Sequence, residues 1–437
     1  MHIQYQFHLL VRMAASWKTY LRQLGPGFIT GVSDDDPSGI ATYSQAGAQF
    51  GTTLLWVTLL CFPLMAVVQE ISARIGRVSG RGLAGNLRQY YPPWLLYGAV
   101  VLISVSNTIN IGADIGAMAA ALELIVGQDR WHIFPLLIGG TSVLALTFLP
   151  YALYASVLKW IGVSVFSYVG IVLFVQIPWR SVLHDTLIPH ISFTDDYLSI
   201  LVAVLGTTIS PYLFFWQSSV EVEEQRADPK EQPVRKAPQQ ARSQFVKIRI
   251  DTYTGMAVSI LVMFFIILTT AVTLHAHGIT HINSAEQAAR ALAPVAGRFA
   301  FLLFAAGIIG TGLLAVPTLA GSVGYAMGEA FRWPAGLNHR PYQAIRFYAV
   351  IAVATLVGMV LNFIKVNLIQ ALIWSAVING LISVPLLLVL LLIGRSHKVM
   401  GKFVIPKKLA AVGWTTALIM AAAACLTIRH LLTPGPG

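Results

Sequence analysis

Apolar runs long enough to cross a lipid bilayer recur along nearly the whole of this 437-residue chain. A membrane-spanning helix needs about 20 predominantly apolar residues, and about eleven runs meet that requirement. They cover residues 24–50, 54–73, 94–124, 131–149, 153–177, 197–220, 253–276, 299–327, 349–364, 368–393 and 409–428. Charged residues make up only 11% of the chain, whereas soluble domains carry about 25%. The sequence therefore predicts an all-α integral membrane protein, with one transmembrane domain over residues 1–437.

The Lys and Arg residues are distributed very unevenly among the predicted loops. If the N-terminus is cytoplasmic, 23 of the 29 fall in inner segments, and those outside are Arg130, Arg180, Arg290, Arg298, Lys365 and Arg429. Such an excess is typical of cytoplasmic loops in membrane proteins. The net charge of +11 is thus a topology signal, and its dispersal over several loops argues against nucleic-acid binding. We expect a multi-pass cell-membrane protein with a cytoplasmic N-terminus and no cleaved signal peptide.

Three other polar features suggest no separate function. Residues 221–247 are rich in Gln, Pro and Arg, so we interpret them as a cytoplasmic linker between the sixth and seventh spans. Cys61 and Cys425 lie in separate apolar runs and indicate neither a disulfide framework nor a zinc site. His275, His277 and His281 lack an accompanying carboxylate or cysteine, which favours a solvated outer loop over a metal site.

The first apolar run contains an acidic interruption, Gly-Val-Ser-Asp-Asp-Asp-Pro-Ser-Gly, at residues 31–39. Ionisable groups at bilayer depth cost several kcal/mol and usually face a cavity or an ion path. Pro37 cannot donate a backbone hydrogen bond and Gly39 tolerates unusual dihedrals, so the helix is expected to unwind here. A broken helix with carboxylates at its break is the expected design of a transporter's cation site.

The sixth run is interrupted as well, by Pro211 within Gly-Thr-Thr-Ile-Ser-Pro-Tyr at 206–212. The proline frees carbonyl groups upstream, near Thr207 and Thr208, to face a cation. Two breaks five spans apart are typical of two five-helix repeats of opposite topology, with the substrate site between them. We therefore expect a first repeat over about 24–178, a second over about 195–394, and an additional helix at about 409–430.

These residues resemble a known family. The first run resembles the first helix of the Nramp family of divalent-metal transporters at Gly25-Pro26-Gly27-Phe28, Asp36-Pro37, Gln45-Ala46-Gly47-Ala48 and Phe50-Gly51. The second run continues the likeness at Gln69, Ala73-Arg74, Gly76, Gly80 and Leu83-Ala84. The resemblance implies a fold of the leucine-transporter type, with two inverted five-helix repeats plus an eleventh helix. It also implies metal uptake into the cytoplasm by alternating access.

The chain departs from the family pattern at the metal ligands. Manganese and iron importers of the family carry Asp-Pro-Gly-Asn in the first helix, where this chain has Asp36, Pro37, Ser38 and Gly39. Their sixth-helix motif is Met-Pro-His, with an alanine carbonyl three residues before the Met. The matching positions here are 210–212, Ser-Pro-Tyr, with a threonine at 207. A thioether selects softer transition metals, so its loss leaves hard oxygen ligands in a wider pocket.

A wide, acidic, all-oxygen site suits Mg²⁺, which keeps several waters and is usually held by one or two carboxylates. The chain is thus similar to the Nramp-related magnesium transporters. Asp36 is the predicted central ligand and Asp35 ranks next, since successive side chains on a helix diverge by about 100°. The Ser210 hydroxyl and the Thr207 carbonyl are further predicted ligands. Secondary candidates are Asp34, Gly39, Asn379 and Asp114. Mn²⁺ is the alternative ion, because a hydrated octahedral site accepts it too.

Proton coupling lacks its usual residues. The positions aligned with the acidic pair and the histidines of proton-coupled relatives hold Asn110, Ala113, Tyr212 and Gln217. Asp114 and Glu123 are nearby carboxylates, and either a displaced proton relay or a structural role fits them. Passive uptake is the simplest mechanism, since an interior-negative potential favours a dication by about 4.6 kcal/mol per 100 mV, twice the single-charge value.

Other functions remain in view. A proton-coupled Mn²⁺ importer keeps both family and fold. A cation-coupled amino-acid carrier keeps the fold, but three adjacent aspartates at the break would repel a substrate carboxylate. A membrane sensor would retain an acidic site at a cost in stability without using it. We find no phosphate-binding loop, nucleophile elbow or metal-hydrolase motif, so the chain is not predicted to be an enzyme. The expected partners are the metal ion, as substrate and not as cofactor, and the lipid bilayer, with no obligate protein partner.

Overall fold

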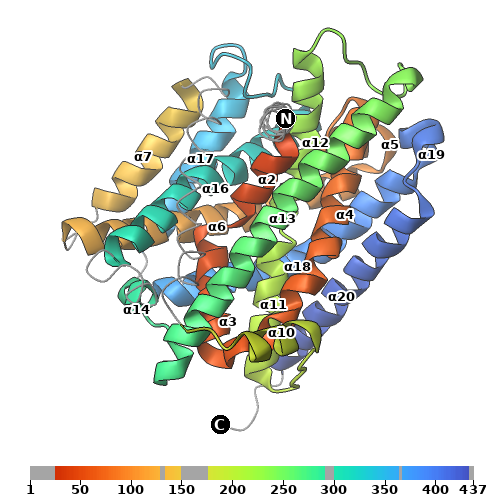
Figure 1. The fold of residues 1–437 in the computed structure, drawn as a ribbon. Coiled ribbons are helices and arrows are strands. Elements are labelled where there is room, and N and C mark those ends of the chain that lie inside the picture. The colour runs from red at the N-terminus through yellow and green to blue at the C-terminus, as the bar shows by residue number, and fades with distance from the viewer. Residues whose placement is uncertain (1–24, 128–132, 149–175, 291–299, 364–366, 433–437) are drawn as a thin grey trace, which may run out of the picture.

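The computed structural model describes residues 25–127, 133–148, 176–290, 300–363 and 367–432, and this part of the chain is helical and without strands. Its long helices lie side by side in a bundle (Figure 1). Helical segments long and apolar enough to span a membrane cover Trp56–Ser79, Pro93–Val126, Asp195–Ala227, Pro238–His277, Phe304–Phe331, Leu368–Arg395 and Lys407–Arg429. The predicted all-α membrane fold is confirmed.

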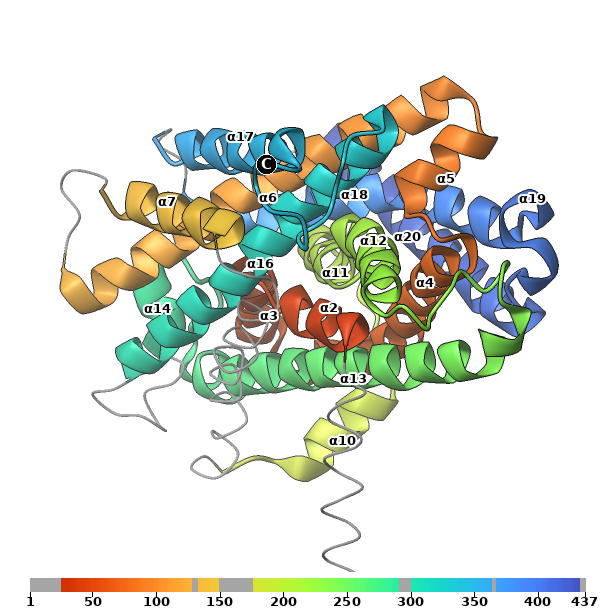
Figure 2. The same ribbon diagram turned by 90° about the horizontal axis from the view of Figure 1, so that it is seen from above.

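Two helices are broken where the sequence predicts it. The first run forms α2 (Pro26–Asp34) and α3 (Pro37–Phe50), and the sixth forms α11 (Asp195–Thr208) and α12 (Pro211–Ala227). In both, a proline is the first residue of the second half, where its missing N–H would have no helical partner. Figure 2 shows these halves in the middle of the bundle, with the long helices around them.

The remaining spans surround this centre. They are α4 (Trp56–Ser79), α6 (Pro93–Val126), α7 (Ile133–Phe148), α13 (Ala241–Thr273), α16 (Ala300–Phe331), α17 (Ile345–Leu361), α18 (Leu368–Arg395) and α20 (Lys407–Leu432). The two shorter members, α7 and α17, are apolar as well. One large cluster of buried apolar side chains runs through nearly all of these helices. The predicted span at 153–177 lies almost wholly outside the described residues.

One sequence expectation is wrong in part. Residues 221–247 were expected to be a linker, yet α12 continues to Ala227 and α13 already begins at Ala241. Both extensions are polar, so hydropathy cannot detect them, and hydrogen bonds between side chains hold them together. Gln225 Nε2, for example, donates to Gln244 Oε1 at 3.1 Å. Short helices that the apolar runs do not predict are α5 (Leu83–Tyr90), α10 (Trp179–Leu187), α14 (Ala285–Arg290) and α19 (His397–Met400).

Glycines allow α2 to pack unusually close to α13. A Cβ added to Gly31 would lie 2.2 Å from the carbonyl carbon of Gly255, and one added to Gly27 would lie 2.8 Å from Thr252 Cα. No larger side chain fits at either position without moving the helices apart. The first half-helix is therefore seated against α13 along its length, and its position depends on that contact.

The basic segments gather at one end of the bundle, the end at which α5 and α19 lie in Figure 1. Arg226 Nη2 donates to Gly80 O at 3.2 Å, and Arg235 Nη1 donates to the carbonyls of Lys398 and Val399 at 2.9 Å each. We call this the basic end, defined by residues 74–88, 226–249, 332–346 and 395–408. The end that carries α10 and α14 is the opposite end. The charge asymmetry of the loops is thus one between two ends of the molecule.

Candidate metal site

The two helix breaks meet in the interior of the bundle. A Cβ added to Gly39, in the first turn of α3, would lie 3.4 Å from both Asp36 Oδ1 and Thr207 Oγ1, which belongs to the end of α11. Tyr212 Oη, in the first turn of α12, donates to Ser33 O at 2.8 Å, just before the end of α2. The acidic motif and the proline of the sixth span therefore lie next to each other in the interior.

Asp36 is the N-cap of α3 and lies at the centre of this site. Its Oδ1 accepts a hydrogen bond from Gly39 N at 2.6 Å, as expected for a carboxylate before Pro37 at the start of a helix. Its Oδ2 accepts a bond from Asn110 Nδ2 of α6 at 3.2 Å. The residue is 1% exposed. These bonds fix the carboxylate in place while leaving lone pairs on both oxygens.

Asp114 lies one helical turn after Asn110 and is fully buried. It is near enough to Asp36 for the two carboxylates to interact electrostatically. Neither of its oxygens accepts a hydrogen bond of normal geometry, although the Ser38 N–H is close enough to interact with this carboxylate. Buried carboxylates nearly always have partners, and an unpaired charge in the interior costs several kcal/mol. Two neighbouring buried carboxylates, one of them without a hydrogen bond of normal geometry, make a place that a cation would stabilise.

The other two aspartates of the motif face a different helix. Asp34 Oδ2 accepts a hydrogen bond from Ser259 Oγ of α13 at 3.0 Å, and Asp35 Oδ1 is 3.3 Å from the same hydroxyl. Both residues are buried, with Asp35 2% exposed. They place two further carboxyl groups next to the site. Among the described residues no group of three or more His, Cys, Asp or Glu side chains is arranged to hold a metal ion.

The second break supplies oxygen atoms, although they are engaged with each other. Ser210 Oγ donates to Thr207 O at 2.6 Å and to Gly206 O at 3.0 Å. Thr208 Oγ1 is 3.0 Å from Tyr43 Oη of α3 and 3.9 Å from Met263 Sδ. The Thr207 carbonyl therefore has one lone pair left, and the Ser210 hydroxyl must rotate before it can help to bind an ion.

Asn379, the remaining sequence candidate, belongs to α18 and contacts α6. Its Oδ1 accepts a hydrogen bond from Ser106 Oγ, while its Nδ2 has no partner. Closer to the break, α18 contacts α3 directly, because Ser38 Oγ donates to Leu372 O at 2.8 Å and lies 3.0 Å from Ser375 Oγ. Asn379 is thus joined to the helix that carries Asn110 and Asp114, and no hydrogen bond joins it to Asp36.

Two sets of contacts beside the site were not predicted, because they join residues that lie far apart in the chain. The first is Asp251 of α13, whose Oδ1 accepts from Gly25 N at 2.7 Å and Phe28 N at 3.0 Å, while its Oδ2 accepts from Gly27 N at 2.7 Å. A carboxylate at a helix N-terminus is stabilising. Asp251 therefore holds the start of α2 against α13.

The second is a polar chain between α2 and the basic end. Thr30 Oγ1 bonds to Gln217, whose Nε2 donates to Glu221 Oε1 at 2.8 Å. Glu221 Oε2 in turn accepts from Arg77 Nε at 2.5 Å. Arg77 is only 1% exposed, and it also pairs with Glu224 and Glu231. This chain fills the space between the metal site and the basic end.

Two of the three histidines in the loop after α13 contact backbone carbonyl groups. His275 Nδ1 is 2.8 Å from Ala48 O, and His277 Nδ1 is 2.5 Å from Thr273 O. Beside them, Gln45 Nε2 donates to Thr280 O at 3.1 Å and its Oε1 accepts from Ile282 N at 2.9 Å. This loop therefore covers the end of α3 at the opposite end of the bundle.

Comparison with known proteins, like the acidic site, indicates similarity to divalent-metal transporters. A family model described as "Natural resistance-associated macrophage protein-like" matches residues 27–429. The chain is 30% identical over 395 residues to the divalent metal cation transporter MntH of Verminephrobacter eiseniae, covering 87% of this chain and 82% of the relative. It is 28% identical over 415 residues to MntH of Mesorhizobium japonicum, covering 91% and 86%.

Solved structures agree on the fold. A mutant of the manganese transporter of Eremococcus coleocola matches with a TM-score of 0.72 at 20% identity, over 96% of this chain and 90% of that chain. A nucleobase-cation-symport-1 family transporter in a closed conformation matches with a TM-score of 0.55 at 13% identity, over 93% of each chain. At these identities the likeness concerns the fold alone.

Proposed function

Since this chain belongs to the Nramp family and is a divalent metal cation transporter, we propose that it imports Mg²⁺ in partly hydrated form by alternating access. The transported metal is its substrate, and the protein is a transporter and not an enzyme. We also propose that the two five-helix repeats cover about 24–178 and 195–394, and that the helix at about 409–430 is additional.

The observation that carries the proposal is the pair formed by Asp36 and Asp114 at the meeting point of the helix breaks. Asp36 is positioned by Asn110, while Asp114 accepts no hydrogen bond of normal geometry and is close to the Ser38 N–H. We propose that the cation binds between these carboxylates and uses the free lone pair of the Thr207 carbonyl. Rotation of the Ser210 hydroxyl would add another oxygen. Waters would complete the shell, because Mg²⁺ gives up its hydration reluctantly.

The neighbouring aspartates support binding through their charge. Asp35 and Asp34 are hydrogen-bonded to Ser259, so they are proposed to attract the cation and not to be its first ligands. Gly39 takes the place of a side-chain ligand and leaves room for a water. Asn379 is proposed to contact that water shell only after a movement of α18.

The choice of Mg²⁺ depends on the ligand atoms. Asp36 accepts hydrogen bonds from the nitrogen atoms of Gly39 and Asn110, and the atoms of the second break beside it are oxygens. Met263 Sδ lies 3.9 Å from Thr208 Oγ1, one layer outside the site. Hard oxygen ligands suit Mg²⁺, Ca²⁺ and Mn²⁺, whereas sulfur favours softer metals.

A proton-coupled Mn²⁺ importer is the second candidate. One of the similar solved structures is of a manganese transporter. The proximity of Asp114 to Asp36 also favours this candidate, because a cation arriving between the two carboxylates would displace a proton held there. In this reading Asp114 would be both a ligand and the group that releases the proton.

Flux measurements separate the two candidates. The purified protein is reconstituted in liposomes, and the influx of Mg²⁺, Mn²⁺ and Ca²⁺ is measured together with internal pH under a negative interior potential. The proposal expects Mg²⁺ influx without acidification. Manganese influx with acidification and no magnesium influx would replace it by the second candidate.

The orientation is also a proposal, in which the basic end faces the cytoplasm. Single cysteines at Lys230, at the basic end, and Glu286, at the opposite end, test it in a background with Cys61 and Cys425 changed to Ser. A membrane-impermeant maleimide applied to intact cells should label only the Glu286→Cys variant. Labelling of the Lys230→Cys variant alone would invert the topology.

A further inference from the structure

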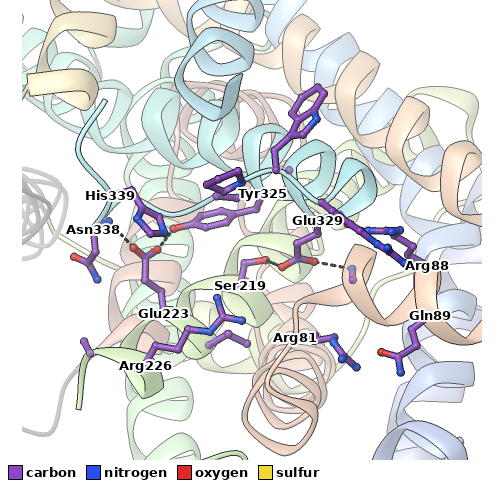
Figure 3. A pocket seen from close by; sticks show the side chains of 18 residues that line it. Arg81, Arg88, Gln89, Ser219, Glu223, Arg226, Tyr325, Glu329, Asn338 and His339 are labelled. Atoms are coloured by element: carbon purple, nitrogen blue, oxygen red, sulfur yellow. Dashed lines mark hydrogen bonds between the residues drawn. The ribbon is translucent and has the colours of Figure 1, made fainter. Parts of the chain in front are cut away.

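A large cavity opens at the basic end, apart from the metal site. Its volume is about 1150 Å³, and α5, α12, α16 and residues 332–339 form its walls (Figure 3). Both acidic and basic side chains line it. Nothing in the proposed transport of metal requires this space to carry so many charged groups.

Glu329 is one of two carboxylates in the wall, and both of its oxygens accept hydrogen bonds from other groups of the wall. Its Oε1 accepts from Gly82 N and Ser219 Oγ, each at 3.1 Å, and its Oε2 accepts from Gly85 N at 2.8 Å. These bonds join α16 to the start of α5 and to α12. Glu329 therefore has a structural role and is a poor candidate for binding a cation in the cavity.

Glu223, the other carboxylate, is satisfied in the same way. It accepts hydrogen bonds from Tyr325 Oη, from Leu337 N at 3.2 Å and from Asn338 N. These contacts attach the segment after α16 to α12. Both carboxylates of the cavity thus hydrogen-bond to groups of its wall and hold the wall elements together.

The guanidinium groups that line the cavity, in contrast, form no ion pairs with the described residues of the wall. Four of them line the cavity: Arg81, Arg88, Arg226 and Arg332. No salt bridge to any of the four is found in the described part of the chain. Arg226 donates to Gly80 O at 3.2 Å and Arg88 to Glu329 O at 3.4 Å, both uncharged carbonyl groups. With four arginines and two glutamates, the lining of the cavity has a net positive charge.

We propose that this cavity binds an anion with more than one phosphate charge, either a soluble polyphosphate or a lipid headgroup that carries more than one phosphate charge. The planar guanidinium group binds phosphate oxygens in pairs, and several arginines around one space are typical of phosphate recognition. The volume exceeds that of a single phosphate, and Trp333 and Pro334 add an apolar wall for the rest of the molecule.

Aromatic side chains beside the cavity make both sources reasonable. The Tyr97 and Phe331 rings lie 5.9 Å apart, and Phe331 stacks on Trp333 at 5.0 Å. Tyr97 and Phe331 are 46% and 43% exposed. Exposed Trp and Tyr side chains mark the level of lipid headgroups in membrane proteins. A lipid phosphate and a soluble anion can therefore both reach the arginines.

An anion bound here would tie together three elements that lie far apart in the sequence. Arg226 belongs to α12, whose other end carries Pro211 and Tyr212 at the metal site, while Arg81 and Arg332 belong to the loops beside α5 and α16. Cross-linking the three elements stabilises the arrangement seen here. The anion is thus expected to slow transport without touching the metal.

The test measures binding and not transport, so it stands or fails independently of the proposed function. Inorganic pyrophosphate is titrated calorimetrically, in metal-free buffer, against the protein in nanodiscs of a neutral lipid. The test variant combines Arg81→Gln with Arg332→Gln, since neither guanidinium has a hydrogen bond that the wall would lose. The control combines Arg180→Gln with Arg290→Gln at the opposite end, which removes the same charge.

The wild type and the control are expected to bind equally, and the Arg81→Gln/Arg332→Gln variant about tenfold or more weakly, as for the loss of two charge-assisted bonds. Repeating the titration with an anionic lipid distinguishes the sources. Competition by the lipid, with lipid retained on the wild type but not on the variant in native mass spectrometry, indicates a headgroup. Undiminished pyrophosphate binding indicates a soluble anion. Equal affinity of variant and control, or no binding of either anion by the wild type, would overturn the proposal.

Discussion

Asp114 is a buried carboxylate that α6 places close enough to Asp36 for the two to interact electrostatically, and it accepts no hydrogen bond of normal geometry. Asn110, one turn earlier, instead donates to Asp36. The site thus pairs a carboxylate that is held in place with one that is not. In a protein interior such a pair repels until a cation, or a proton, lies between the two groups. This arrangement leads to two predictions about single residues.

Replacing either carboxylate by its amide should impair transport. We expect Asp36→Asn and Asp114→Asn each to lower Mg²⁺ uptake into liposomes about tenfold or more, because a contact to a charged group contributes about 1.5–3 kcal/mol. The metal-free Asp114→Asn protein should also melt at a higher temperature, since it no longer buries an unpaired charge. Mg²⁺ should stabilise it less than the wild type.

Asp34→Asn is the matched control for these substitutions. It changes the same chemical group two residues before Asp36, but its carboxylate faces Ser259. Its uptake should fall much less. Full Mg²⁺ uptake by the Asp114→Asn variant, together with an unchanged melting temperature, would remove Asp114 from the site.

A sulfur atom at the second break should change the preference for metals. Ser210→Met removes the hydroxyl that now donates to the Thr207 and Gly206 carbonyls and places a thioether beside the site. We expect the ratio of Cd²⁺ to Mg²⁺ uptake to rise about tenfold, because soft ligands favour soft metals. Ser210→Ala also removes the hydroxyl but adds no sulfur. Equal ratios in the two variants would show that the residue at this position does not set the preference.

At the scale of helices, the two half-helices of the first span are held differently. α3 is buried along most of its length and hydrogen-bonded to α18 and α11. α2 has nine residues, and its start is held by one carboxylate, that of Asp251 on α13. Its glycines pack directly against α13. α2 is therefore the element whose release would open a path from the metal site.

Weakening the attachment of α2 should be measurable as faster hydrogen exchange. Asp251→Asn keeps the size of the side chain but removes the charge that three backbone N–H groups share, a loss of about 1–2 kcal/mol at a helix N-terminus. We expect amides 25–31 to exchange faster in detergent or nanodiscs. Asp195→Asn removes a carboxylate from the first turn of α11 and should leave these amides unchanged. Unaltered exchange in the Asp251→Asn variant would mean that packing alone holds α2.

The difference between local backbone effects and contacts between distant helices explains which parts of the fold could be predicted. The breaks were predictable because Pro37 and Pro211 act locally on the backbone. The early start of α13 was not, since its first residues are polar and are helical only through their neighbours at the basic end. Asp36 could be chosen from its place before Pro37. The roles of Asp114 and Asp251 depend on contacts between distant helices, which no local pattern reveals.

At the scale of the whole molecule, the metal site is closed toward both ends. Asp34, Asp35 and Asp36 are at most 2% exposed. Toward the opposite end, the loop bound to Gln45 covers α3. Toward the basic end, Arg77 of α4 pairs with glutamates of α12 and of the segment after it. An ion can cross only if these two closures open in turn, and the second depends on a single buried cation.

Removing that cation should open the basic end. In the Arg77→Gln variant, Glu221 and Glu224 would be left close together without their shared partner, and breaking a buried ion pair typically costs about 3–5 kcal/mol. We expect the repulsion to separate α12 from α4. A cysteine at position 30, which is buried beside Gln217, reports on this opening. With Cys61 and Cys425 changed to Ser, an impermeant thiol reagent applied from the basic end should label the Thr30→Cys variant about tenfold faster when Arg77 is also replaced.

Arg74→Gln is the control for the labelling experiment on the Arg77→Gln variant. Arg74 lies on the same helix and is also buried, but it pairs with Glu70 at 2.6 Å and stacks over the Phe245 ring at 4.4 Å. Its loss removes the same charge at nearly the same depth without releasing α12. Faster labelling in the Arg77→Gln protein alone means that the arginine closes the path from the metal site. Equal acceleration in both variants would mean that any loss of positive charge loosens this end, and the closure would then lie elsewhere in the bundle.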